Sequence, residues 1–199
     1  MDLMVTGGRV VVAGPDTRAL LAPRTGGIMA LRLAPGVAPF VLGLPAAEIR
    51  DARPEFGQLG LRHRADLSAL SGGAKVLEQW ALGLAGRAEI PRWPTEIVRL
   101  ARSGARVGRI AAELGWSTRT LHRNCLFAFG YGPAMLGRFL RFRTAVAAAD
   151  TGRLLAEVAA ACGYADQAHL ARDARELAGV SMSELVRERR AGAQPVSGA

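Results

Sequence analysis

The chain has 199 residues, of which 50% are apolar, and a formal net charge of +9. This composition permits an ordinary packed core and argues against wholesale disorder. Arg, Gly and Pro interrupt every apolar run before the ~20 residues that a membrane-spanning helix requires, and no basic patch leads into an apolar stretch at the N-terminus, so we expect no membrane segment, no signal peptide and a cytoplasmic location.

The positive charge is concentrated in one segment. Residues 1–96 hold 11 basic and 9 acidic side chains, and residues 144–199 hold 6 and 7. Residues 99–143 hold nine arginines and one acid, Glu113, which leaves a charge of +8. That density is higher than solubility requires, so the segment favours binding to a polyanion.

Residues 1–57 are predicted to form a small, partial β-rich domain for sensing or dimerisation. Gly7-Gly8 predicts a hairpin turn between the first two of four candidate strands, and Pro45–Ile49 predicts a helical turn. The candidate strands are Leu3–Val5, Arg9–Ala13, Ile28–Leu33 and Val37–Leu42. Four strands bury one face but do not close a barrel, so we expect the open sheet edges to pair with something.

Residues 58–105 are predicted to form a helical linker and packing layer. Ala74–Leu84 carries apolar residues at helical spacing, and Pro94–Ala101 opens with proline and ends before Gly104. The small and polar residues 191–199 are predicted to be a flexible tail.

Residues 106–190 contain an internal repeat. Ile110–Trp116 and Val158–Tyr164 match at an offset of 48, with an aliphatic residue, two alanines, a glycine and an aromatic residue in equivalent places. One inserted residue then moves the offset to 49, and the similarity continues to Leu136 and Leu185. Each copy predicts a short helix, a tight turn and a second helix, which is the order of a helix-turn-helix.

The turn chemistry of both copies fits this prediction. Gly115 and Gly163 tolerate the positive φ of a sharp turn, and Ser117 and Asp166 are good N-caps for the helices that follow. The inner faces of those helices carry Leu121 and Cys125, then Leu170 and Ala174. The outer faces, which are the candidate DNA-binding surfaces, carry Thr118, Arg119, His122 and Arg123 in the first copy, and Gln167, Ala168, Ala171 and Arg172 in the second.

A connecting helix is predicted over Pro133–Ala149. At 1.5 Å per residue it would be ~25 Å long, which could place two recognition helices about one DNA turn, ~34 Å, apart. The predicted fold is therefore mainly α: a C-terminal double helix-turn-helix domain joined by a long helix, preceded by the small β-rich region. Arg, Gln and His can bond base edges, so the predicted ligand is double-stranded DNA.

The repeat resembles the arabinose-regulator (AraC) family of bacterial transcription factors, most specifically over Ile110–Leu121 and Gly163–Leu170. The resemblance covers about residues 106–190 and implies two helix-turn-helix units joined by a long helix. Val12–Arg18 and Leu44–Arg50 look like part of the N-terminal β-rich domain of a subset of these regulators. We therefore expect the chain to begin inside that domain. Two explanations stay open: the sensor is reduced, or the start codon is assigned late.

The resemblance also implies which residues contact DNA. The family's recognition positions correspond to Arg119, His122 and Arg123, then to Gln167, Ala171 and Arg172. RNA polymerase and a second copy of the chain are further candidate partners, while the sequence identifies no small-molecule effector.

The sequence departs from the family at several positions. Cys125 and Ala174 stand where the family commonly has a core Phe. Ala168 and Ala171 give the second helix little beyond van der Waals contact with thymine methyl groups. We therefore expect the first unit to dominate DNA affinity.

Two other functions remain as alternatives. Catalysis is disfavoured, because the three histidines are His63, His122 and His169, and no phosphate loop, metal-ligand cluster or carboxylate pair accompanies them. We expect no enzyme activity, metal or cofactor. The second alternative is a non-enzymatic antagonist or co-regulator that pairs with full-length relatives through its partial N-terminal domain.

Overall fold

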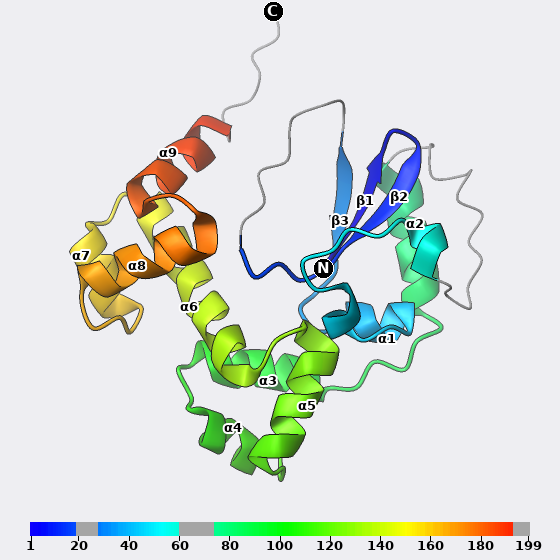
Figure 1. Ribbon diagram of the computed structural model, residues 1–199, viewed down its shortest axis with the longest axis horizontal. Helices are drawn as coiled ribbons and strands as arrows, with labels where there is room; N and C mark the ends of the chain where they lie inside the picture. The colour runs from blue at the N-terminus through cyan, green and yellow to red at the C-terminus, as the bar shows by residue number, and fades with distance from the viewer. Residues whose placement is uncertain (19–27, 60–73, 193–199) are drawn as a thin grey trace, which may run out of the picture.

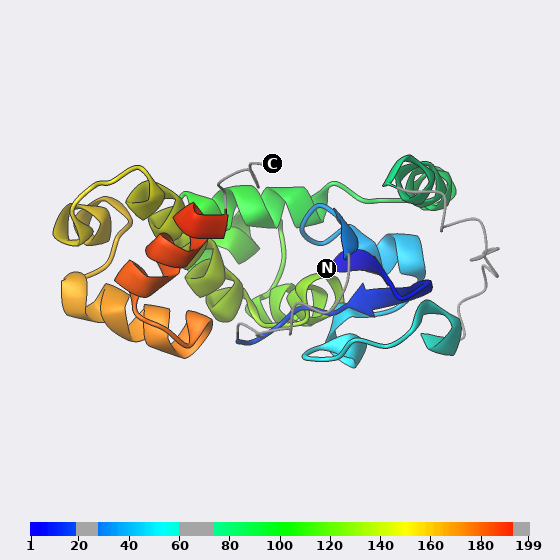
Figure 2. The ribbon, with the colours of Figure 1, turned by 90° about the horizontal axis from the view of Figure 1, so that it is seen from above.

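The computed structural model describes residues 1–18, 28–59 and 74–192. His63 lies outside these ranges, as do residues 193–199 of the predicted tail, while residues 191 and 192 of that tail instead end the last helix. The described part is mainly helical, with one small antiparallel sheet near the N-terminus, as the sequence predicts (Figure 1). Viewed from above, the sheet and the C-terminal helices lie at opposite ends of an elongated molecule (Figure 2).

The predicted hairpin is confirmed. β1 (Asp2–Thr6) pairs with β2 (Arg9–Ala13), and Gly7 and Gly8 both have positive φ, at 53° and 74°. Two successive residues of positive φ make the two-residue turn whose twist matches that of paired strands. β3 (Met29–Arg32) pairs with the other side of β1, so the strand order is β2-β1-β3.

The fourth predicted strand, Val37–Leu42, is wrong. This run forms a short helix, α1 (Ala38–Leu42), with Pro39 in its first turn and Gly43 as a left-handed cap. Pro39 has no N–H for a strand ladder, and its fixed φ suits the start of a helix. The outer edge of β2 instead accepts an irregular segment: the Val12 and Gly14 amides donate to the carbonyls of Pro54 and Ala52, both at 3.0 Å.

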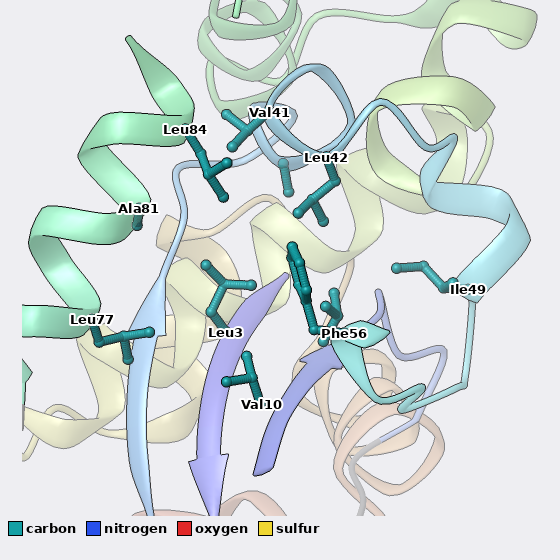
Figure 3. Packing of buried hydrophobic residues seen from close by; sticks show 11 residues of the cluster. Leu3, Val10, Val41, Leu42, Ile49, Phe56, Leu77, Ala81 and Leu84 are labelled. Atoms are coloured by element: carbon teal, nitrogen blue, oxygen red, sulfur yellow. The ribbon is translucent and has the colours of Figure 1, made fainter. Parts of the chain in front are cut away.

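The N-terminal core lies between the sheet and the helices around it. Residues 46–49 form the predicted helical turn as η1 (Ala46–Ile49), followed by η2 (Phe56–Leu59). The helix α2 (Ala74–Ala85), also predicted, packs on this core. The buried side chains of this core come from the sheet, α1, η1, η2 and α2 (Figure 3): Leu3, Val10, Val41, Leu42, Ile49, Phe56, Leu77, Ala81 and Leu84.

Seven helices follow in the C-terminal part of the described chain: α3 (Trp93–Arg102), α4 (Val107–Glu113), α5 (Thr118–Phe129), α6 (Pro133–Asp150), α7 (Leu155–Ala161), α8 (Gln167–Ala178) and α9 (Met182–Gly192). These bounds confirm both helix-turn-helix pairs, α4–α5 and α7–α8, and the long connecting helix α6. No helix of the described ranges is long and apolar enough to cross a membrane.

The helix α6 is shared between two separate cores. Its first half contributes Leu136 and Leu140 to a cluster with α3, α4 and α5, and its second half contributes Phe142 and Val146 to a cluster with α7, α8 and α9. The side chains of α3, which the sequence analysis placed in the linker, therefore belong to the first of these cores. One rigid element thus sets the positions of both helix-turn-helix units.

Candidate nucleic-acid interface

The two turns have the same backbone geometry. Gly115 and Gly163 have φ of 66° and 73°. The next residue of each copy, Trp116 or Tyr164, donates its amide to the carbonyl five residues earlier, at 2.8 and 2.9 Å. These bonds close the end of the first helix and aim the chain into the second.

The second helix of each unit begins at its predicted cap. The Thr120 amide donates to Ser117 Oγ at 3.1 Å, and the His169 amide donates to Asp166 Oδ1 at 2.6 Å. An N-cap of this kind satisfies an amide that the helix itself leaves unpaired. The repeat in the sequence is therefore a repeat in hydrogen bonding as well.

The predicted inner faces of α5 and α8 are buried. Leu121, Cys125 and Ala174 have 0% exposure, and Leu170 has 1%. Burial also raises the pKa of the Cys125 thiol to about 12. The reactive thiolate is therefore scarce at neutral pH, and Cys125 acts as a small apolar core residue.

The predicted outer faces are exposed. Thr118, Arg119, His122 and Arg123 lie on the solvent side of α5, although the His122 ring packs close to Gly132 at the start of α6. On α8, Gln167, Ala168 and Arg172 are exposed and Ala171 is half-buried. The structure thus gathers each predicted set on one face of its helix, and the base contacts themselves stay a prediction.

Only some of the nine arginines between residues 99 and 143 are available to DNA, because four of them pair with acids. Arg99 pairs with Glu96, and Arg109 lies 3.6 Å from Glu113. Arg138 and Arg141 pair with acids of α8, which lies outside the segment. The remaining five make no ion pair within the described ranges: Arg102, Arg106, Arg119, Arg123 and Arg143.

The helix α8 is held against α6 by a buried charge cluster that no sequence pattern predicted. Asp173 is 3% exposed and lies 2.8 Å from Arg138 and 3.9 Å from Arg141. The Arg141 guanidinium also lies over the Tyr164 ring, 4.8 Å from its centre, and Tyr164 packs edge-on against His169. Contacts of α6 therefore reach both the middle of α8 and its first turn.

The helix α5 is held by contacts of another kind. They come from the N-terminal region, that is, the sheet together with α1, η1, η2, α2 and the segments between them. The Phe40 ring lies edge-on to Trp93 and to Phe127, with ring centres 5.7 and 5.3 Å apart, and Trp93 in turn contacts Trp116 at 5.5 Å. These aromatic contacts join α1, α3, α5 and the first turn.

The end of α5 is also closely covered. A side chain at Gly130, the cap of α5, would meet Pro15 Cγ at 2.4 Å, and the Arg50 guanidinium donates to the Gly130 carbonyl at 3.3 Å. Gly36 packs as closely on Phe129 and Pro94, where an added Cβ would lie 2.7 Å from each. The N-terminal region is therefore part of the support of α5.

The described ranges contain no group of three or more His, Cys, Asp or Glu side chains placed to bind a metal ion. The chemistry that this surface offers is exposed guanidinium, amide and hydroxyl groups on two helices. These are donors suited to phosphate oxygens and to base edges.

The comparison with known families agrees with this geometry. Residues 110–188 match the family model described as "Helix-turn-helix domain". Among solved structures, the chain is similar to ToxT from Vibrio cholerae O395, with 16% identity and a TM-score of 0.47 over 62% of this chain. The match spans 50% of that ToxT chain. No curated protein matches the sequence.

Proposed function

Because residues 110–188 form a DNA-binding helix-turn-helix domain of the AraC family of transcription regulators, we propose that this protein contacts bases in the major groove with two recognition helices, α5 and α8. The observation that carries the proposal is the duplicated geometry. Both units have the same turn, the same type of cap and a face turned to solvent at equivalent positions.

The length of α6 supports the use of both units on one duplex. Its 18 residues correspond to about 27 Å, on the scale of the ~34 Å between successive major-groove positions on one side of DNA. Two recognition helices can therefore contact neighbouring turns of the same face.

The proposed contacts are unequal. In the first unit Arg119, His122 and Arg123 provide hydrogen-bond donors, whereas two of the four positions in the second unit are alanines, Ala168 and Ala171. A bidentate arginine contact to guanine discriminates between bases more strongly than a methyl contact does. We propose that the first unit contributes most of the affinity.

The proposal is tested by selecting bound duplexes from random-sequence DNA and then measuring the affinity of the Arg123→Ala variant for the selected duplex and its point variants. We expect a loss of about 1–3 kcal/mol and a relaxed preference at one base pair. Arg172→Ala is the matched control, because Arg172 is the equivalent residue of α8. It should relax a different base pair, in the other half of the site.

An equal loss on all sequences would make Arg123 a phosphate contact and would contradict its assignment to base contact. If the wild-type protein selects no sequence, the proposed function itself is wrong.

The alternative function, an antagonist that pairs with full-length relatives, is favoured by one observation. The outer edge of β3 has no partner strand among the described residues, and such an edge can pair with another chain. A salt titration separates the two functions. The affinity of a DNA-binding protein falls by ~0.9 log unit per log unit of salt for each phosphate contacted, whereas an antagonist of this kind needs no DNA.

A further inference from the structure

A groove of about 680 Å³ lies between the two helix-turn-helix units. One wall is the connection between α3 and α4, and the other is the end of α7 with its turn at Gly163. Its floor is one face of α6, formed by Gly137, Arg138, Arg141 and Thr144. Figure 1 shows the α3–α4 connection and the α7–α8 turn on the same side of α6.

The groove is positively charged. Four arginines line it, Arg102, Arg106, Arg138 and Arg141, and none of the described residues that line it is acidic. The two on α6 are engaged by Asp173 of α8. Arg102 and Arg106 are exposed and have no acidic partner in the part of the chain that the structure describes.

Neither of these two side chains is needed by the local fold. Arg106 stands at the N-cap of α4, but its side chain makes no capping hydrogen bond there, and Arg102 is the last residue of α3. Two guanidinium groups on one wall of a groove without acids leave a positive potential that an anion would stabilise. Guanidinium is well suited to phosphate because its donors match the phosphate oxygens.

We propose that this groove binds the sugar–phosphate backbone of DNA between the segments that α5 and α8 contact, with Arg102 and Arg106 each contacting one phosphate. This inference rests on the proposed function. A duplex that contacts both recognition helices must cross the space between the two units, and the groove lies in that space with walls from each of them. Phosphate contacts fix the register of a protein on DNA and carry no base information.

The test is a salt titration of the full chain carrying Arg102→Gln and Arg106→Gln together. The probes are the duplex selected by the wild-type protein and a scrambled duplex of the same length. We expect the slope of log affinity against log salt to fall by about 2, because each lost phosphate contact removes ~0.9. The loss should be equal on the two duplexes, so that the preference for the selected sequence is unchanged.

The matched control is Arg87→Gln with Arg92→Gln. It removes the same charge from exposed arginines that do not line the groove. The slope of this control should stay close to that of the wild type. Helix content and the thermal midpoint, measured by circular dichroism for both double variants, show that each is folded.

Three results would overturn the inference. In the first, the slope of the folded groove variant is unchanged while Arg123→Ala still alters sequence preference. The groove then does not contact DNA, and the proposed function stays intact. A changed preference at one base pair would make Arg102 or Arg106 a base contact. An equal fall in slope for the control would make the effect one of net charge alone.

Discussion

Gly130 and Gly179 occupy the same place in the two helix-turn-helix units, yet their surroundings differ. Each caps the second helix of its unit in the left-handed region, at φ of 81° and 75°, and each amide donates to the carbonyl four residues earlier at 3.1 Å. Gly130 is covered by Pro15 and Ala46 of the N-terminal region, whereas nothing among the described residues lies within 4 Å of the position that a Cβ on Gly179 would take.

Each helix packs in the apolar core of its own unit, but the further contacts that hold α5 and α8 differ. The helix α5 is supported by apolar and backbone contacts with the N-terminal region, and α8 is supported by the charge cluster of Asp173 with α6. The N-terminal region therefore contacts α5 directly, whereas the ion pairs that hold α8 come from α6. Two copies of one motif are thus supported by different kinds of contact, and a substitution can weaken the support of one copy without the other.

The largest expected effect is on the free energy of unfolding, and it differs between alanine variants of the two caps, Gly130 and Gly179. In Gly130→Ala, the left-handed backbone costs about 1–2 kcal/mol and the clash with Pro15 about 1–3 more, so the free energy of unfolding should fall by about 3 kcal/mol. Gly179→Ala carries only the backbone strain and should cost about 1 kcal/mol. Urea denaturation of both variants measures the difference.

The fluorescence of the three tryptophans, Trp80, Trp93 and Trp116, reports the N-terminal region and the first unit only. Gly130→Ala should therefore shift the fluorescence transition, and Gly179→Ala should shift it less. Equal losses in the two variants would show that the N-terminal region does not support α5.

The next effect concerns the support of α8. Asp173→Asn removes the charge between Arg138 and Arg141 and should lower the free energy of unfolding by about 2 kcal/mol, because a buried charged hydrogen bond is lost while the arginines, being partly exposed, regain water. Glu176→Gln is the control, since Glu176 also pairs with Arg138 but is exposed; it should cost less than about 1 kcal/mol.

Circular dichroism should detect the Asp173→Asn loss at lower urea than tryptophan fluorescence does, because no tryptophan lies in the second unit. Coincident transitions at the wild-type midpoint would show that the cluster does not hold α8.

Local chemistry was enough to predict the helix-turn-helix units. Gly115, Gly163, Ser117 and Asp166 act on neighbours within a few residues, so their roles are visible in the sequence, and the buried positions follow from helical spacing. The wrong strand at Val37–Leu42 had a local signal too, since Pro39 favours a helix start over a strand interior.

What the sequence did not reveal depends on partners far along the chain. Arg138 bonds Asp173 from 35 residues away, so its charge was counted as available to DNA. Gly130 and Gly179 look alike because Pro15, which distinguishes them, lies more than 100 residues from either. Contacts of this kind follow from the packing of the N-terminal region on α5, which no local pattern encodes.

The last comparison tests whether the difference in support accompanies a difference in DNA contact. Arg119→Ala should weaken binding to the selected duplex by about 1–3 kcal/mol, as expected for a charged donor at a base edge. Gln167→Ala, on the less charged face of α8, should cost less than Arg119→Ala does. Both side chains are exposed and neither is an ion-pair partner in the described ranges, so the comparison is between contacts with DNA. If Gln167→Ala costs more, the second unit dominates affinity, and α8 is the main contact with DNA.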